Sequence, residues 1–254
     1  MKIQFASDFH LEDADNCTFL KEHPIEVAGD VLVLAGDIFV QGQESPFFQD
    51  FLDWCSCNFK LTFIVPGNHE FYGGADIGAT MQGWEKPLRE NVKCMNNQSA
   101  VVGDVEFFFT TLWAHVPAEA EEMVNKYMQE CKSALYNGAP FTAAEYKQAH
   151  AQCRNWLDSA LARSQAPRKG VVTHHCPIVA EDPRYESNGL STAFVNPMEE
   201  YVAESGVDAW IFGHTHYNGA NSQRCGKTLM ATNQLGYAAK GACKGYSNAA
   251  YLEI

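Results

Sequence analysis

Short apolar runs recur along the chain, and they end in glycine or in clusters of polar residues. Their β-branched and aromatic side chains are typical of buried strands. This pattern predicts strands at residues 3–7, 31–35, 61–65, 105–110, 170–173, 209–212, 228–231 and 249–252. The turn Gly103-Asp104 also predicts a pair of strands around residues 100–110.

Helical signals lie between these strands. A serine cap followed by proline begins the first helix, an acidic first turn begins the second, a capping box begins the third, and a glycine follows the fourth. The predicted helices cover residues 45–55, 117–135, 142–164 and 196–205. Interleaved strands and helices predict an α/β domain. We expect a single domain, residues 1–254, in which residues 117–164 form a helical insertion.

The composition narrows the class of partner. With 46% hydrophobic and 19% charged residues, the 254-residue chain resembles an ordinary globular protein. Its 18 Lys and Arg residues against 31 Asp and Glu residues give a net charge of −13. This charge repels polyanions, so we expect no long nucleic acid as partner. A small anionic substrate remains compatible if the charge is locally reversed.

The cysteines indicate the compartment. Nine of them are scattered along the chain, and none form a CxxC pair. The first residues lead directly into an alternating strand pattern, and no long apolar run follows. We therefore expect a cytoplasmic protein with reduced thiols and without a membrane segment.

Potential metal ligands follow five of the predicted strands. The motifs are Asp8-Phe9-His10, Gly36-Asp37, Gly67-Asn68-His69-Glu70, His174-His175-Cys176-Pro177 and Gly213-His214-Thr215-His216. In open α/β sheets the carboxyl ends of the strands are where ligands bind. A single Gly-Asp turn or histidine is usually structural, but five such motifs in order favour a shared site. In an extended segment, His214 and His216 face the same side and can converge on one ion.

The donor types indicate which metals fit. Asp, Asn and His without Cys suit Mn²⁺, which we favour, or Fe or Zn²⁺. Seven donors are too many for one tetrahedral ion, but they suit two ions that share a carboxylate. Two divalent cations outweigh the charges of Asp8 and Asp37 by about +2, which attracts an anionic substrate and acidifies a bound water.

The motifs DxH, GD, GNHE, HHCP and GHTH, in this order over residues 8–216, resemble those of the calcineurin-like metallophosphoesterases. This resemblance implies an α/β (α+β mixed) fold, a four-layer αββα sandwich of two mixed β-sheets flanked by helices. It implies that one divalent metal ion is held by Asp8, His10, Asp37 and His216. It further implies that Asp37 bridges to a second ion, held by Asn68, His174 and His214.

The same resemblance implies the catalytic roles. His69 would protonate the leaving oxygen or orient the phosphoryl group, and Glu70 would orient His69 through a hydrogen bond. Asp37 would act as the bridging ligand. Asn68 and His69 would contact the substrate.

Several positions remain open. His174 and His175 compete for one ligand place, and we favour His174 because it directly follows the strand; His175 would then support a ligand or face the substrate. His115 is a rival ligand or a substrate contact. Arg184 and Tyr185 are candidates to reach a substrate phosphate, although such a polar loop is more often simply solvated.

These observations predict a metal-dependent phosphoesterase that hydrolyses a small phosphomonoester or phosphodiester through a dinuclear metal centre with a bridging hydroxide. Nucleotide-derived esters are among the candidate substrates. One alternative is a catalytically silent binding scaffold of the same fold, which the complete ligand set disfavours. Another is a nuclease, which the acidity of the chain disfavours.

Overall fold

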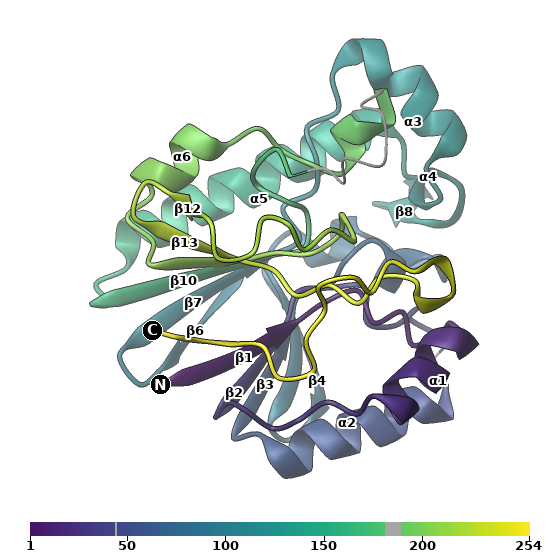
Figure 1. Ribbon diagram of the computed structural model, residues 1–254. Coiled ribbons are helices and arrows are strands. Elements are labelled where there is room, and N and C mark those ends of the chain that lie inside the picture. The colour runs from purple at the N-terminus through teal and green to yellow at the C-terminus, as the bar shows by residue number, and fades with distance from the viewer. Residues whose placement is uncertain (44, 181–188) are drawn as a thin grey trace.

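Two six-stranded mixed β-sheets face each other in the computed structural model, which describes residues 1–43, 45–180 and 189–254 (Figure 1). The first sheet has the order β14 (Tyr251–Glu253), β1 (Lys2–Ala6), β2 (Val31–Leu34), β3 (Leu61–Ile64), β5 (Val92–Asn96) and β4 (Trp84–Arg89). The second has the order β12 (Arg224–Cys225), β13 (Thr228–Ala231), β11 (Ala209–Ile211), β10 (Arg168–Thr173), β7 (Val105–Thr110) and β6 (Gln98–Val102). In both sheets the central strands run parallel, and each edge strand is antiparallel to its neighbour.

Helices cover the outer face of each sheet. Helices α1 (Ala14–Glu22) and α2 (Pro46–Asn58) lie against the first sheet, and α5 (Ala143–Arg163) and α6 (Glu199–Glu204) lie against the second (Figure 1). The predicted αββα sandwich is therefore confirmed. Short 3-10 turns lie at His69–Phe71, Gly78–Thr80, Ala118–Ala120, Gly189–Ala193 and Ala238–Lys240.

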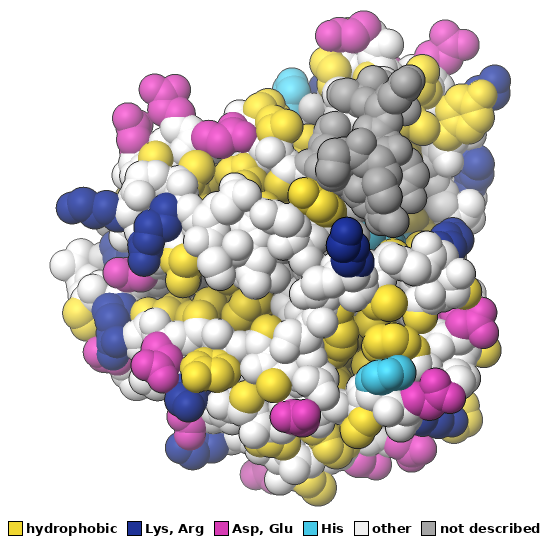
Figure 2. Space-filling model, in the orientation of Figure 1, with side chains coloured by type: hydrophobic (Ala, Val, Ile, Leu, Met, Phe, Trp, Pro, Cys, Tyr) yellow, Lys and Arg dark blue, Asp and Glu magenta, His cyan; other side chains and the backbone are white. Residues whose placement is uncertain are grey.

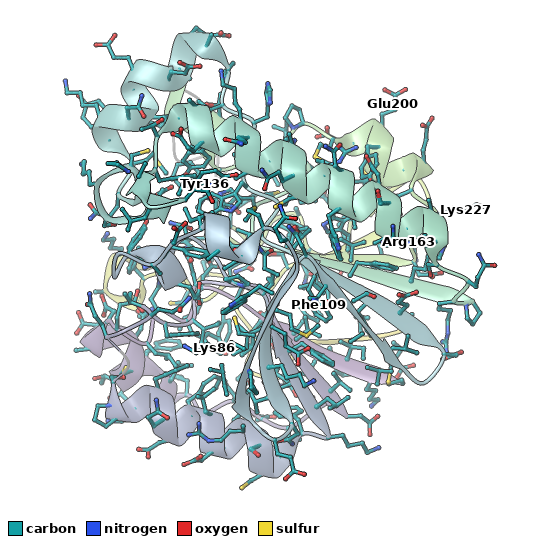
Figure 3. The ribbon with its side chains drawn as sticks, turned by 180° about the vertical axis from the view of Figure 1, so that it is seen from behind. Lys86, Phe109, Tyr136, Arg163, Glu200 and Lys227 are labelled. Atoms are coloured by element: carbon teal, nitrogen blue, oxygen red, sulfur yellow. The ribbon has the colours of Figure 1, made fainter. Side chains whose placement is uncertain are left out.

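Side chains alternate along each strand between the core that separates the two sheets and the outer layer of helices. Val31 and Val33 of β2 face the core between the sheets, whereas Leu32 and Leu34 face the helices of the first sheet, because successive side chains on a strand point to opposite faces. Aromatic rings join the two sheets across this core, where Phe63 and Phe109 have ring centroids 5.0 Å apart. Figure 3 shows Phe109 in this layer from behind.

A lobe with its own apolar cluster projects from one end of the sandwich (Figure 1). It contains α3 (Glu121–Tyr127), α4 (Glu130–Ser133), β8 (Leu135–Tyr136) and β9 (Ala139–Pro140). The first half of α5 packs into this cluster through Tyr146 and Ala149, whereas Leu157 and Ala160 of its second half cover the second sheet. The predicted insertion therefore shares α5 with the outer layer of the sandwich.

Two predicted helices differ from the structure. The continuous helix at 117–135 is broken, because Met128 takes an extended backbone and buries its side chain in the lobe. The helix at 196–205 begins only at Glu199, because the residue before a proline, here Asn196, is disfavoured in helical conformation.

The elements that were not predicted include α1, β4, β5 and the two-residue strands β8, β9 and β12. Helix α1 has a weak apolar stripe, but Asp13 caps it by accepting from the Asp15 and Asn16 amides at 2.8 and 3.2 Å. No helix in the described part of the chain is both long and apolar enough to span a bilayer.

Candidate metal centre

The parallel strands of both sheets end at one edge of the sandwich, and the predicted ligands lie in the loops that follow. Strands β1, β2 and β3 lead to Asp8, Asp37 and Asn68, and strands β10 and β11 lead to His174 and His214. The parallel register of each sheet brings these loops together. Residues far apart in the sequence therefore meet in one site.

The first group of potential ligand atoms belongs to Asp8, His10, Asp37 and His216, and these atoms all lie within 4.8 Å of one another. The Nε2 atoms of His10 and His216 face each other at 3.0 Å. The His216 Nε2 also lies 3.3 Å from Oδ1 of Asp8. Of the four, only His216 is not fully buried.

The second group belongs to Asp37, His174 and His214. The Nε2 of His174 lies 3.4 Å from Oδ1 of Asp37 and 3.1 Å from Nδ1 of His214. The side-chain oxygen of Asn68 lies 3.0 Å from the same nitrogen. Asp37 thus belongs to both groups.

The spacing of the donors fits divalent cations. Metal–ligand bonds of about 2.0–2.2 Å place neighbouring ligand atoms about 3.0–3.4 Å apart around one ion. The five distances given above are 3.0–3.4 Å. Ring nitrogens that face each other this closely cannot both carry a proton, and two lone pairs without a shared proton repel. A cation between them removes that repulsion, so both groups have the geometry and the donors of metal sites.

Hydrogen bonds to backbone carbonyls fix which ring nitrogen of His174 and of His214 is left to bind a metal. The Nδ1 of His174 lies 2.8 Å from the carbonyl oxygen of Ala35, which can only accept, so Nδ1 carries a proton and Nε2 is the nitrogen left for a metal. The Nε2 of His214 donates to the carbonyl of Ala193 at 3.3 Å, which leaves Nδ1 free. In both rings the free nitrogen is the one in the second group.

The backbone at these positions is unusual. Five of the potential ligands have a positive φ that non-glycine residues rarely adopt: Asp8 (58°), His10 (46°), Asp37 (56°), His214 (76°) and His216 (49°). Such backbone persists only where the surroundings hold it. Gln234 does so for one loop, because its Oε1 accepts from the His216 amide at 2.5 Å.

Charges in the site shift several pKa values. Burial alone would raise the pKa of Asp37, but the charges of His174 and His69 lower it well below its usual value. Burial would lower the pKa of His174, but the Asp37 carboxylate raises it to about 9. Burial also lowers the pKa of His10 and of His214, which keeps both rings neutral, as ligands must be.

The expectation that Glu70 orients His69 is wrong. Its carboxylate instead accepts hydrogen bonds from four backbone amides, those of Gly67, Asp37, Ile38 and Phe39, at 2.6, 3.1, 2.8 and 3.3 Å. The 3-10 turn His69–Phe71 separates the two side chains, so Glu70 points into the protein and ties the loop after β3 to the loop after β2.

Glu12 takes the place next to His69. Its Oε1 lies 2.7 Å from Nδ1 of His69, whose Nε2 faces Oδ2 of Asp37 at 3.9 Å and the Tyr237 hydroxyl at 3.4 Å. Burial would lower the pKa of His69, but Asp37 and Glu12 raise it to about 9. His10, Glu12 and His69 form a third group of potential ligand atoms.

The remaining candidates lie outside the two main groups. His175 is fully buried; its Nδ1 lies 3.2 Å from the Thr111 carbonyl, and its ring packs against Trp113 and His214. His115 is exposed, and its ring lies beside His150. Within the described residues, neither belongs to a group of clustered ligand atoms. Arg184 and Tyr185 lie outside the described residues.

The sequence did not single out Glu12 or Tyr237, and it indicated Tyr72 only as an aromatic residue near the motifs. Glu12 continues the alternation of Asp8 and His10, and this spacing could have identified it. Tyr72 and Tyr237 carry no motif: Tyr72 accepts from the Asn68 amide, and Tyr237 stacks on His10 at 4.6 Å.

Comparisons with known proteins show what the chain is similar to. The family model of calcineurin-like phosphoesterases matches residues 1–218. An uncharacterized protein of Acanthamoeba polyphaga mimivirus is 25% identical over 262 residues, covering 92% of this chain and 91% of that protein. Phosphopantetheinyl Hydrolase from Mycobacterium tuberculosis has a similar structure over 100% of this chain and 95% of its own, with a TM-score of 0.67 and 13% identity. A dimetal phosphatase from Danio rerio matches over 92% of this chain and 87% of its own, with a TM-score of 0.45 and 16% identity.

Proposed function

Because the chain belongs to the calcineurin-like phosphoesterase family, as its motifs predicted, we propose that it hydrolyses a small phosphomonoester or phosphodiester with two divalent cations. One observation carries this proposal: Asp37 belongs to both groups of potential ligand atoms. A carboxylate that belongs to both groups could hold two ions side by side, as a dinuclear site needs.

The proposed ligands of the first ion are Asp8, His10, Asp37 and His216, and those of the second are Asp37, Asn68, His174 and His214. When bound, the ions would acidify a water molecule and neutralise charge on the phosphoryl oxygens. The mixture of oxygen and imidazole donors favours Mn²⁺, with Fe or Zn²⁺ as alternatives.

His69 is the proposed acid. Glu12 accepts from its Nδ1, so its Nε2 is the nitrogen that faces Asp37 and the site. A proton held at Nε2 can pass to the leaving oxygen, and the raised pKa of about 9 keeps it there at neutral pH. Asn68 precedes His69 in the same loop and is the second proposed substrate contact.

The substrate is proposed to be small. The net charge of −13 opposes a long nucleic acid, and on the face in Figure 2 basic side chains are interspersed with acidic ones. Nucleotide-derived esters remain candidates. Of the five aromatic residues near the motifs, Phe9, Phe71 and Trp113 are fully buried, which leaves Tyr72 and Tyr217 as the candidates to stack on a base. The nine free cysteines favour the cytoplasm as location.

The test combines metal content with turnover. Elemental analysis of the purified protein and hydrolysis of p-nitrophenyl phosphate and bis(p-nitrophenyl) phosphate with Mn²⁺ are compared between wild type and Asp37→Asn. We expect two ions per chain and metal-dependent turnover in the wild type, and loss of both in the variant. A folded wild type that binds no metal and is inert would instead indicate a binding scaffold. Cleavage of single- or double-stranded DNA would indicate a nuclease.

A further inference from the structure

A chain of hydrogen bonds, buried or partly buried, connects Asn68 with the lobe. The Asn68 Nδ2 donates to the Tyr72 hydroxyl at 2.6 Å, and that hydroxyl donates to Oε2 of Glu130 in α4 at 3.0 Å. The hydroxyl of Tyr146 in α5 donates to the other carboxylate oxygen. Glu130 and Tyr146 are fully buried, so these groups depend on one another for their hydrogen bonds.

The chemistry of the groups sets the direction of this chain. A carboxylate only accepts, and a phenol has one proton to donate. At neutral pH a phenol keeps that proton, and the Glu130 carboxylate 3.0 Å away is its acceptor. Since the proton goes to Glu130, the Tyr72 oxygen accepts, and its donor is the amide nitrogen of Asn68.

This direction decides which atom of the amide faces the metal centre. An amide has one oxygen and one nitrogen, so holding the nitrogen at Tyr72 turns Oδ1 of Asn68 toward Nε2 of His174, at 3.0 Å. Only the oxygen can bind a cation, because the NH₂ group has no lone pair to offer. A rotated amide would place two hydrogens in the second group of ligand atoms.

We propose that Glu130 and Tyr72 are positioning residues, which hold the Asn68 oxygen toward the second cation and make occupancy of that position depend on the lobe. This inference rests on the proposed function, since it takes Asn68 as a metal ligand. A merely structural role would tie the lobe to the sandwich without any effect on the second ion.

Glu130→Gln tests the direction of the hydrogen bonds. Glutamine offers one acceptor and one donor, so one of the two phenols must accept from it. That phenol is Tyr72, because its proton can pass to a rotated Asn68, whereas Tyr146 has no other acceptor in the described part of the chain. We expect the second Mn²⁺ to bind about 10- to 100-fold more weakly than in the wild type, with the first ion unchanged.

The readouts are calorimetric titration of the metal-free protein with MnCl₂ and the EPR signal of a coupled manganese pair. Tyr146→Phe is the matched control, because it removes a hydrogen bond from the same carboxylate without reversing Tyr72. It should lower the unfolding midpoint but leave the affinity for the second ion unchanged.

The double variant Glu130→Gln/Tyr146→Phe separates positioning from structure. Without Tyr146, the glutamine oxygen is free to accept from Tyr72, so the second ion should bind more tightly than in Glu130→Gln alone. If Glu130 had only a structural role, the second ion should bind more weakly to the double variant than to Glu130→Gln, because the double variant has lost one more hydrogen bond.

If Glu130→Gln does not fold, the variant Tyr72→Phe tests the same inference. It frees the Asn68 amide to rotate and should weaken only the second ion. Wild-type affinity for both ions in a variant with native circular dichroism overturns the inference and leaves the proposed function intact. A wild type that fails to bind two manganese ions overturns both, and it does so before any variant is compared.

Discussion

The Nδ1 of His69 lies 2.7 Å from Oε1 of Glu12, and the same oxygen lies 3.4 Å from Nδ1 of His10. One carboxylate therefore faces the proposed acid and a proposed metal ligand. Because it accepts from Nδ1 of His69, it leaves Nε2 of that ring directed at the site. The Glu12 and His69 side chains are only 24% and 14% exposed, so solvent screens this contact weakly.

Loss of Glu12 should impair substrates with poor leaving groups most. In Glu12→Ala the His69 ring loses its partner, and we expect kcat for phenyl phosphate to fall about 10-fold or more, a fraction of the roughly 100- to 10,000-fold that a positioned acid contributes. Hydrolysis of p-nitrophenyl phosphate should change less, because nitrophenolate leaves without a proton. The measurement is the ratio of the two kcat values.

Two variants control this prediction. Glu12→Gln keeps an oxygen that can accept from His69, so it should recover much of the lost rate. Asp15→Asn removes an equal charge from the exposed first turn of α1 and should leave the ratio unchanged. Equal losses on both substrates in Glu12→Ala would contradict the positioning role.

The contact between Glu12 and His69 should also make the stability of the metal-free protein depend on pH. Burial would raise the pKa of Glu12, but the two histidines lower it from 4.5 to about 2, so its contribution is lost as pH falls through that value. The pKa of His69 is raised from 6.5 to about 9, so its contribution is present below 6.5 and is lost as pH rises through 9.

Wild type and Glu12→Gln should therefore differ most in free energy of unfolding at about pH 5.5 and little at about pH 10. Urea unfolding in EDTA at both pH values measures this difference. A difference that stays constant over the range would show that the two side chains do not exchange charge stabilisation.

Glu70 should behave as a scaffold residue. Glu70→Ala leaves four buried amides unpaired, and at about 1–3 kcal/mol for each such group we expect a destabilisation of about 3 kcal/mol or more. Urea unfolding of the metal-free protein measures it, and Glu204→Ala, at an exposed position on α6, should stay within about 0.5 kcal/mol of wild type. A Glu70→Ala variant as stable as wild type would refute this assignment.

The strands and the loops that follow them could be predicted because their signals are local. Each buried strand is an apolar run, and the parallel pairing of β2 with β3 brings Asp37 and Asn68 to one edge of the first sheet. His174 follows β10 of the second sheet and meets them because the two sheets pack with these strand ends at the same edge. The helices of the lobe were less predictable. Their ends depend on which side chain enters the lobe core, as Met128 does.

The partners of the site residues could not be predicted in the same way. Glu70 is adjacent to His69 in sequence, yet within the 3-10 turn that contains both residues its side chain points to backbone amides. The actual partner, Glu12, lies 57 positions away, and Glu130 lies 58 positions from Tyr72. Such contacts arise only from the packing of loops, which no local pattern contains.

Gly67→Ala should remove metal binding by steric conflict alone. A Cβ on Gly67 would collide with Oδ1 of Asp37 and lie 2.7 Å from its backbone nitrogen and 2.7 Å from Cε1 of His174. Because Asp37 belongs to both groups, we expect elemental analysis to show loss of both ions, together with loss of phosphatase turnover. Gly103→Ala is the control: it has open space and only the strain of a positive φ, about 1 kcal/mol, so it should bind two ions. A folded Gly67→Ala protein that still binds two ions would mean that Asp37 can move aside without loss of the centre, and the shared-carboxylate arrangement would have to be abandoned.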